Sequence, residues 1–426
     1  MSKLRKIFCI SLSFIMLLSG STIAQATEAT IETETNSQWY RDAIENMNTI
    51  KSEKYEYTIT NANKKEIMLL RAYVLEVDEN GTYIIPSEYD GYKVTALNYF
   101  FLEEFRGYLY QEEDRSDELN KIKKLIIPEG IREINDPEYP LEPDEKIGFY
   151  DLFNLKEAIL PSTMKVVPRY MFADCKKLEK VTLSEGLEEI DFCAFYNCKK
   201  LKKITLPKGL KVIRSKAFYN CKSLKSIKLP NSLTTIDRFA FKNCKGLKGK
   251  FRITKNVEII EHGAFEYCYN LSGFRVAEGN KHFSQKGGVL FKINKKGEKI
   301  EIVSCLPSKK TENYKIPSTV KKIDMFAFAG SKYIKKIILP NKLDVINVRA
   351  FINSNIRSID IPKSVRYIGD RAFYKCDKLE KIVIRGNPEY IYQEAIIECK
   401  KVTVYDHGNN FTYKDAKKCG FRLVKV

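Results

Sequence analysis

Regularly spaced cysteines are the residues of this chain whose type and spacing could do chemistry, because thiolates bind metals, act as nucleophiles and form disulfides. The sequence of 426 residues contains 11 cysteines, and at seven positions a Cys lies three residues after the second residue of an Ala-Phe, Met-Phe or Ala-Ile pair. These ladder cysteines are Cys175, Cys198, Cys221, Cys244, Cys268, Cys376 and Cys399. None belongs to a paired C-x-x-C motif, which argues against a zinc site.

The same spacing argues against disulfides between ladder cysteines. Equivalent side chains of stacked repeats point the same way, so a bond between them would be strained. Ser331 and Ser354 fill the equivalent slot in two repeats, which shows that a small, weakly polar side chain satisfies the position. We therefore expect buried free thiols that donate weakly to backbone carbonyls. Cys193, Cys305 and Cys419 lie outside the ladder and are the better candidates for an exposed thiol or for one disulfide.

No other residues form a recognisable catalytic, metal-binding or cofactor-binding motif. His262, His282 and His407 are the only histidines, and none lies in a metal-ligand pair or beside a Ser or Cys motif of the hydrolase type. The glycines at 287–288 are not followed by the G-K-[ST] of a phosphate-binding loop. The sequence therefore predicts a protein that is not an enzyme and has no metal or cofactor.

A short sequence repeat supplies the elements that would position these side chains. An Ala-Phe pair, or a close variant, recurs every 22 to 24 residues, apart from one longer gap between Phe265 and Phe328. The phenylalanines of the repeat are Phe172, Phe195, Phe218, Phe241, Phe265, Phe328, Phe351 and Phe373. Such self-similarity is typical of a solenoid, in which each unit buries its apolar side against the next. We expect these rings and the ladder cysteines to stack into a structural spine.

The repeat 201–223 illustrates the expected local structure. Residues 201–207 alternate apolar and polar side chains, which predicts a short strand that Pro207 and Gly209 end. A second apolar edge follows at 210–213, and residues 215–221 fit a single helical or 3₁₀ turn.

The repeat resembles a known family. Segments 201–223 (LKKITLPKGLKVIRSKAFYNCKS) and 178–200 (LEKVTLSEGLEEIDFCAFYNCKK) match the pattern L-x-x-I-x-L-P-x-x-L-x-x-I-x-x-x-A-F-x-x-C at nearly every position. This pattern is similar to the BspA-type leucine-rich repeat of bacterial surface and secreted proteins, over about residues 83–426. The resemblance implies a β-rich, right-handed leucine-rich-repeat solenoid. It would have one short strand per repeat of 22–24 residues, short helical or 3₁₀ turns and roughly eleven coils. The resemblance also implies adhesion or protein binding, and no catalytic residues.

The first residues predict export. Lys3, Arg5 and Lys6 precede an apolar stretch at 7–18, and a small-x-small cleavage site follows at 24–26. Ser21 stands where a lipoprotein would carry its lipid-bearing Cys, and the C-terminus shows no sorting motif. We therefore expect a protein that is secreted or held non-covalently at the cell surface, with no transmembrane segment after signal cleavage.

The domain organisation follows from the repeats and their interruptions. The predicted segments are a signal peptide (1–26), a linker with a short helix (27–50), an N-terminal cap (51–105), leucine-rich repeats (106–272), an enlarged repeat with a β-hairpin (273–315), further repeats (316–400) and a C-terminal cap (401–426).

A strong positive charge is the remaining functional signal. The formal net charge is +19, and removal of the signal peptide, which carries three cations and no acid, leaves +16. Such a charge favours anionic wall polymers, acidic polysaccharides or lipid head groups. A composition rich in Lys, Ile, Asn and Tyr would produce the same charge without selection for binding. The predicted strand face for a partner consists of Lys202, Lys203, Thr205, Lys225, Lys228, Lys248, Arg252, Lys335, Lys336, Arg357, Asp360 and Lys381.

Three functions remain open at this stage. The first is a non-catalytic surface or secreted protein that binds an extracellular protein or an anionic glycopolymer of the cell wall or of a host. The second is a structural wall-associated protein that charge alone holds, without a specific partner. The third is an exported enzyme or enzyme regulator. Nucleic acid is not an expected partner outside the cell, and the sequence leaves the oligomeric state open.

Overall fold

The computed structural model describes residues 49–98, 101–102, 116–134, 149–408 and 410–426. The expected signal peptide and nearly all of the expected linker and short helix lie outside the described residues. Thr49 and Ile50 belong to strand β1 (Thr49–Lys51), so the short helix does not reach residue 50.

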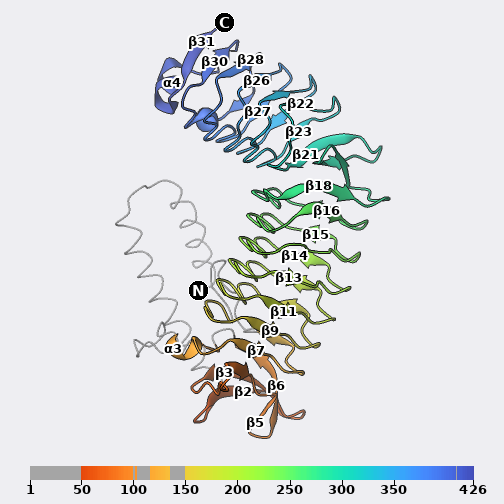
Figure 1. The fold of residues 1–426 in the computed structure, drawn as a ribbon, viewed down its shortest axis with the longest axis vertical. Coiled ribbons are helices and arrows are strands. Elements are labelled where there is room, and N and C mark those ends of the chain that lie inside the picture. The colour runs from red at the N-terminus through yellow and green to blue at the C-terminus, as the bar shows by residue number, and fades with distance from the viewer. Residues whose placement is uncertain (1–48, 99–100, 103–115, 135–148, 409) are drawn as a thin grey trace, which may run out of the picture.

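Stacked coils of the repeat form a curved β-solenoid with little helix, which confirms the predicted fold class (Figure 1). Most repeats contribute two short strands, one more than the sequence pattern indicated. The added strand forms because the L-x-x-I edges of successive coils lie in register and pair in parallel, as Glu189 does with Val212. Two parallel sheets therefore run along the stack, and we call them the first-strand face and the second-strand face.

The N-terminal half contains a five-stranded sheet of each face. The first-strand face consists of β4 (Thr82–Ile84), β7 (Lys124–Ile126), β9 (Glu157–Ile159), β11 (Lys180–Thr182) and β13 (Lys203–Ile204), followed by the separate pair of β16 (Gly249–Ile253) and β18 (Leu271–Val276). The second-strand face consists of β10 (Val166–Val167), β12 (Glu189–Ile190), β14 (Val212–Ile213), β15 (Thr235–Ile236) and β17 (Ile259–Ile260).

A mixed sheet covers the N-terminal end of the stack. Strand β2 pairs antiparallel with both β1 and β3. Strand β3 pairs in parallel with β6, and β6 pairs in parallel with β8. The further elements here are β2 (Tyr55–Asn61), β3 (Glu66–Ala72), β5 (Glu88–Tyr89), β6 (Tyr92–Leu97), α3 (Ser116–Leu119) and β8 (Glu133–Ile134). The sheet shields the apolar end that an uncapped solenoid would expose to water.

The Ala-Phe turns of most repeats are successive tight turns, whereas the expected 3₁₀ turn forms in the repeat of Ala395, as η2 (Gln393–Ile396). In the repeat 178–200, Tyr196 N donates to Cys193 O and Cys198 N donates to Phe195 O. Cys193 and Asn197 have positive φ angles of 56° and 59°, in the left-handed region. A left-handed residue on each side of Phe195 prevents the turn from continuing as a helix.

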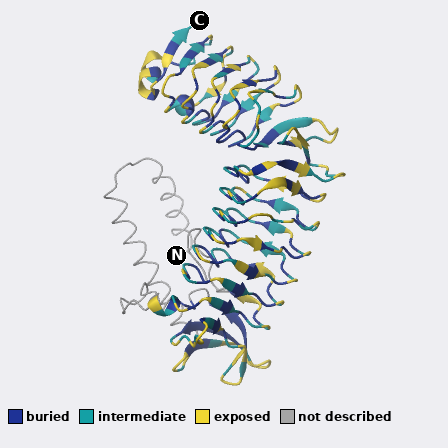
Figure 2. Ribbon diagram, in the orientation of Figure 1, coloured by how far each residue is buried: buried dark blue, intermediate teal, exposed yellow. Residues whose placement is uncertain are grey.

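The spine phenylalanines stack as parallel rings. Phe218 lies between Phe195 and Phe241, at centroid distances of 5.3 Å and 5.4 Å. All eight phenylalanines named above are buried. The stack also contains Phe149, whose ring lies 6.5 Å from that of Phe172. Buried residues recur in the coils of both halves of the solenoid (Figure 2).

A three-stranded antiparallel insertion separates the two halves of the core. It follows β16 (Gly249–Ile253) and β18 (Leu271–Val276) and consists of β19 (Phe283–Lys286), β20 (Val289–Ile293) and β21 (Lys299–Cys305). Alternate side chains of β20 face opposite ways, so Leu290 packs in the N-terminal core and Phe291 in the C-terminal core. The insertion is therefore a layer between two hydrophobic cores.

The C-terminal half continues both faces. The first-strand face consists of β22 (Asn313–Lys315), β24 (Lys336–Ile338), β26 (Ser358–Ile361), β28 (Lys381–Ile384), β30 (Thr403–Asp406) and β31 (Arg422–Lys425). The second-strand face continues from β21 through β23 (Lys322–Ile323), β25 (Val345–Ile346), β27 (Tyr367–Ile368) and β29 (Tyr390–Ile391), which the 3₁₀ helix η2 (Gln393–Ile396) follows.

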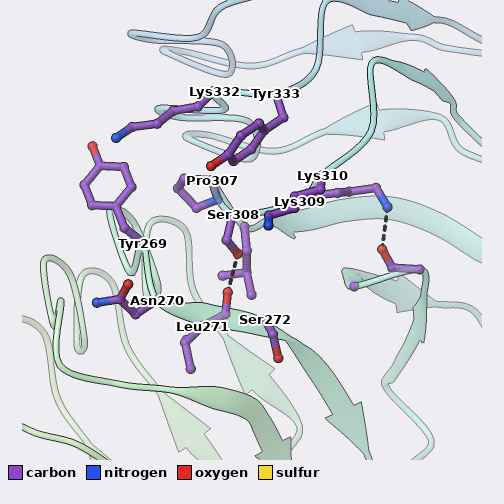
Figure 3. A pocket seen from close by; sticks show the side chains of 13 residues that line it. Tyr269, Asn270, Leu271, Ser272, Pro307, Ser308, Lys309, Lys310, Lys332 and Tyr333 are labelled. Carbon is purple, nitrogen blue, oxygen red and sulfur yellow. Dashed lines mark hydrogen bonds between the residues drawn. The ribbon is translucent and has the colours of Figure 1, made fainter.

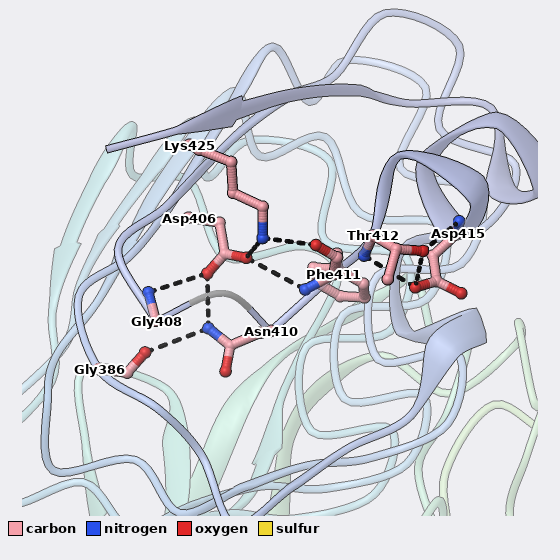
Figure 4. A network of polar contacts seen from close by, with 8 residues as sticks. All are labelled: Gly386, Asp406, Gly408, Asn410, Phe411, Thr412, Asp415 and Lys425. Atoms are coloured by element: carbon pink, nitrogen blue, oxygen red, sulfur yellow. Dashed lines mark hydrogen bonds and ion pairs between the residues drawn. The ribbon is translucent and has the colours of Figure 1, made fainter.

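Helix α4 (Tyr413–Cys419) and β31 close the C-terminal end. Thr412 and Asp415 form a capping box at the start of α4, and Gly420 ends it in the left-handed conformation. The buried Asp406 carboxylate pairs with Lys425 Nζ at 3.1 Å and accepts hydrogen bonds from Asn410 Nδ2 and Phe411 N (Figure 4). This network ties the last strand and the segment before α4 to the final coil.

Candidate functional site

Register along the first-strand face brings outward side chains of successive coils into columns. Ile84, Ile126 and Ile159 are paired in register at the ends of their strands, and Thr182 is in register with Ile159. The same column continues in repeat order through Thr205 and Lys228, and then through Arg252, which is in register with Arg275. Along this column the side chains change from apolar to hydroxyl-bearing to cationic. Neighbouring members lie about 4.8 Å apart, the spacing of parallel strands.

The structure leaves all twelve side chains of the predicted strand face exposed. It does not, however, leave them equally available to a partner, because several form ion pairs between neighbouring coils. Lys202 Nζ lies 2.6 Å from Glu179, and Arg385 Nη2 lies 2.6 Å from Asp360. Lys335 pairs in the same way with Glu312.

These ion pairs change the charge of the face more than its stability. Exposed pairs contribute about 0–1 kcal/mol. The hydrogen bond from Lys202 nevertheless holds the pKa of the Glu179 carboxyl below its ordinary value, so both groups stay charged and neutralise each other. Lys180 neutralises Glu157 in the same manner at 2.7 Å. The coils on both sides of the middle are therefore compensated in part, since Lys203, Lys336, Arg357 and Lys381 belong to none of the ion pairs between described residues.

The middle coils of the first-strand face carry cations without such partners. We call this cluster the basic patch; it consists of Lys225, Lys228, Lys248, Lys250, Arg252 and Arg275, all of them exposed. None of the ion pairs between described residues includes any of the six. Like charges about 5 Å apart repel by about 1 kcal/mol in water, so the patch slightly disfavours the fold and attracts an anion.

The ladder cysteines are structural. Cys198 Sγ donates to Phe172 O at 3.1 Å, and Cys221 Sγ donates to Phe195 O at 3.1 Å, so each thiol bonds the preceding coil. Burial raises the pKa of the Cys268 thiol to about 12, which disfavours the nucleophilic thiolate.

The three cysteines outside the ladder are buried free thiols, so the expectation of an exposed thiol or a disulfide among Cys193, Cys305 and Cys419 is wrong. Cys305 takes the place of a spine phenylalanine, because its backbone N–H donates to Ala327 O as that of Phe328 does to Ala350 O. Sequence reasoning missed this because no Ala precedes Cys305.

Comparison with known proteins agrees with this architecture. The model of the "BspA type Leucine rich repeat region" matches residues 145–272 and 300–417, in six copies, which is more than half of the chain. The chain belongs to the BspA-type leucine-rich repeat family. A search of curated proteins found no match.

Solved structures similar to this BspA-type chain share its fold. A leucine-rich cell surface protein of Faecalibacterium prausnitzii is 20% identical with a TM-score of 0.62, over 87% of this chain and 97% of that one. A leucine-rich repeat protein of Eubacterium ventriosum is 19% identical with a TM-score of 0.54, over 88% and 83%. The pneumococcal vaccine antigen PcpA is 18% identical with a TM-score of 0.55, over 89% and 98%.

Two members of the basic patch were missed from the sequence of this BspA-type chain. Lys250 lies where the pairing of β16 with β18 is irregular, since Gly249 pairs with Leu271 and Lys250 with Gly273. Its repeat also has one more residue between Leu247 and Phe251 than the simple repeat count allows. Arg275 lies in the enlarged repeat, where the spacing breaks down. The recurrence of Phe-Arg-aliphatic at 251–253 and 274–276 was the signal that could have found it.

The described part of this BspA-type chain was also searched for metal and membrane features. Among those residues, no group of three or more His, Cys, Asp or Glu side chains is placed to hold a metal ion. No helix in the same ranges is long and apolar enough to cross a membrane.

Proposed function

We propose that this protein is an exported, non-catalytic binding module that holds an anionic glycopolymer along its first-strand face. The basic patch is the observation that carries the proposal. Its cations come from successive coils, at a spacing of about 5 Å set by the strands. A polymer with regularly spaced carboxylates or phosphates can contact several of them at once, which a small anion cannot do.

The contrast between the patch and its surroundings supports recognition over background composition. A lysine-rich composition alone would place uncompensated cations along the whole face. Instead, Lys180, Lys202 and Lys335 are each matched by a carboxylate from an adjacent coil. The coils of Lys228, Arg252 and Arg275 hold no ion pair between described residues on this face, whereas uncompensated cations elsewhere, such as Lys203 and Lys336, share their coil with a paired residue.

A protein partner is the second candidate, and the isoleucine end of the same column favours it. Ile84 is 56% exposed, and Ile126 and Ile159 beside it are half-buried. Apolar side chains in a row at the surface are typical of protein contacts. A partner with an apolar end and an acidic end would fit the change in chemistry along the column.

The test is a binding isotherm across a salt series. The secreted form that begins at residue 27 would be titrated with polygalacturonate, and with neutral dextran as a control polymer. We expect saturable binding to polygalacturonate that weakens with salt, since salt screens exposed charges, and no binding to dextran.

Charge reversal locates the site. The patch variant Lys228→Glu/Arg252→Glu/Arg275→Glu should lose binding at least about tenfold, from three lost charge contacts of roughly 0.5–1 kcal/mol each. The matched control Lys208→Glu/Lys342→Glu/Lys363→Glu changes the net charge equally, at exposed lysines outside the patch. Equal losses in the two variants would favour wall attachment by net charge alone, and the proposal would fail.

A further inference from the structure

A cavity of about 660 Å³ lies at the junction between the two halves of the solenoid (Figure 3). The first-strand face is interrupted here, because β18 pairs with β16 only and a new sheet begins at β22. Tyr269 and Ser272 border the cavity from the N-terminal half, and Lys332 and Tyr333 border it from the C-terminal half. We call it the junction pocket.

The lining of the junction pocket is cationic. Lys309, Lys310 and Lys332 line it, and none of the residues that line it is Asp or Glu. Lys309 Nζ is held in place by a hydrogen bond of 2.6 Å to Gly287 O. Lys310 is exposed and belongs to none of the ion pairs between described residues. The pocket therefore favours a ligand with a negative charge.

Aromatic rings form the other part of the lining. Lys332 Nζ lies 4.5 Å from the centre of the Tyr269 ring, which fixes the ammonium over one aromatic face. Tyr333 is 46% exposed and has no ring partner among the described residues. An exposed ring beside hydroxyl and amide groups, here those of Ser272 and Asn270, offers a flat apolar surface with polar groups around it.

We propose that the junction pocket binds an acidic sugar, with its carboxylate near the lysines and its ring against Tyr333. A pyranose has an apolar face of C–H groups and a rim of hydroxyls, which matches the exposed ring and the polar groups around it. The volume lies in the range of about 300–1,000 Å³ that is usual for small-ligand sites. None of the basic-patch residues lines the pocket, so this proposal stands apart from polymer binding on the first-strand face.

The probes are glucuronic acid, N-acetylneuraminic acid, glucose and inorganic phosphate, each titrated into the secreted form and followed by calorimetry. Either acidic sugar should bind at least about tenfold more tightly than glucose, since one charge-assisted contact is worth about 1.5 kcal/mol or more. Preference for N-acetylneuraminic acid would indicate a terminal sialic acid as the natural source, and preference for glucuronic acid a uronic acid polymer.

Two variants test separately the contributions of the Lys332 charge and of the Tyr333 ring to binding. Lys332→Gln should weaken the binding of the acidic sugar and of phosphate alike. Tyr333→Ala should lower the affinity for the acidic sugar by about fivefold or more, because a ring contact of about 1 kcal/mol is lost. The affinity for phosphate should stay unchanged. Tyr333 and Lys332 are exposed, so both variants should fold, as circular dichroism would verify. The exposed Lys342→Gln serves as control and should bind as the unaltered protein does.

The proposal is overturned by any of three results. Neither acidic sugar binds at millimolar concentration, glucose binds as well as the acidic sugars, or Tyr333→Ala leaves sugar binding unchanged. The patch variant of the preceding subsection should keep the sugar site, so loss of polymer binding and loss of sugar binding can be told apart.

Discussion

The side-chain amide of Asn353 donates a hydrogen bond of 2.9 Å to the hydroxyl of Tyr267, although 86 positions separate the two residues. The coils that carry them are not adjacent, because those of Cys305 and Phe328 lie between them in chain order. The rings of Phe239 and Phe326, also from non-adjacent coils, lie 5.2 Å apart. The Cys305 coil has no Ala-Phe turn, so the turns on its two sides converge and set the bend of the solenoid.

An ion pair lies at the centre of this bend. Lys242 Nζ is 2.8 Å from the Glu266 carboxylate, which is almost completely buried. The ammonium also lies 4.7 Å from the centre of the Phe239 ring and 5.6 Å from that of Phe326. The convergence of the two halves thus places the Lys242 ammonium among aromatic rings of both halves.

Replacement of Lys242 by Met should destabilise the protein in a pH-dependent way. Burial raises the pKa of the Glu266 carboxyl even though Lys242 opposes the shift. A raised pKa means that stability is highest at low pH and falls as pH rises above the ordinary value of about 4.3. Without Lys242 this loss of stability with rising pH should be larger. Lys242→Met should therefore lower the free energy of unfolding by about 3–5 kcal/mol at pH 7 and by clearly less at pH 4.

Urea unfolding at pH 4 and pH 7 measures this difference. The double variant Lys242→Met/Glu266→Gln is the control, since it lacks the carboxyl and should show no added pH dependence. An equal cost of Lys242→Met at both pH values would contradict the assigned role of the pair.

The Phe spine should account for a large part of the stability of each coil. Phe218→Ala removes a fully buried ring between two parallel neighbours and should cost about 3–5 kcal/mol. Chemical denaturation monitored by circular dichroism would show the cost, with the exposed Lys222→Ala as the control that leaves stability unchanged. A loss below about 1 kcal/mol would mean that the coil repacks easily and that the spine is not what holds the stack.

The Asp406 network should make the C-terminal cap sensitive to acid. Burial opposes ionisation of Asp406, but the bonds from Phe411 N, Asn410 and Lys425 outweigh it and hold the pKa below its ordinary value. The stabilisation is thus complete above the ordinary value of about 3.9 and is lost as pH falls through the lowered pKa. Asp406→Asn should cost about 1–3 kcal/mol at pH 7 and progressively less towards pH 2.

Hydrogen exchange of residues 410–426 would follow this cap directly. Protection there should fall in Asp406→Asn at pH 7, whereas protection of the Phe218 coil should stay the same. If the two regions lost protection together, the network would be stabilising the whole solenoid and not the cap.

The cysteines should be unreactive in the folded protein. All ten that the structure describes are buried and free, and burial raises the thiol pKa of Cys198 well above its ordinary value. Ellman's reagent should therefore label the native secreted form slowly and label ten thiols in denaturant. Rapid labelling of the native protein, or a disulfide found by mass spectrometry, would contradict the structure.

The sequence predicted the features that repeat and missed those that depend on interruptions. Phe218 and Cys221 could be placed because their neighbours recur 23 positions away. Phe149 and Cys305 could not, since an insertion precedes the first and no Ala marks the second. The second strand of each repeat was missed as well, because a two-residue strand has too little sequence pattern to predict.

The predicted binding face shows the same limit. The alternation of apolar and polar residues along each strand predicted that these side chains are exposed, and the structure shows them exposed. The compensation of Lys202 by Glu179 depends on how side chains of adjacent coils turn towards each other, which the repeat pattern does not specify. The junction pocket joins Tyr269 to Tyr333 across the irregular insertion, and no periodic signal connects them.

Lysine footprinting would test the central claim most directly. The secreted form would be acetylated with and without saturating polygalacturonate, and the modified lysines would be identified by mass spectrometry. We predict that the polymer protects Lys225, Lys228, Lys248 and Lys250 and leaves Lys208, Lys342 and Lys363 as reactive as before. Uniform protection of all surface lysines, or protection confined to lysines outside the basic patch, would contradict the assignment of the first-strand face as the binding surface.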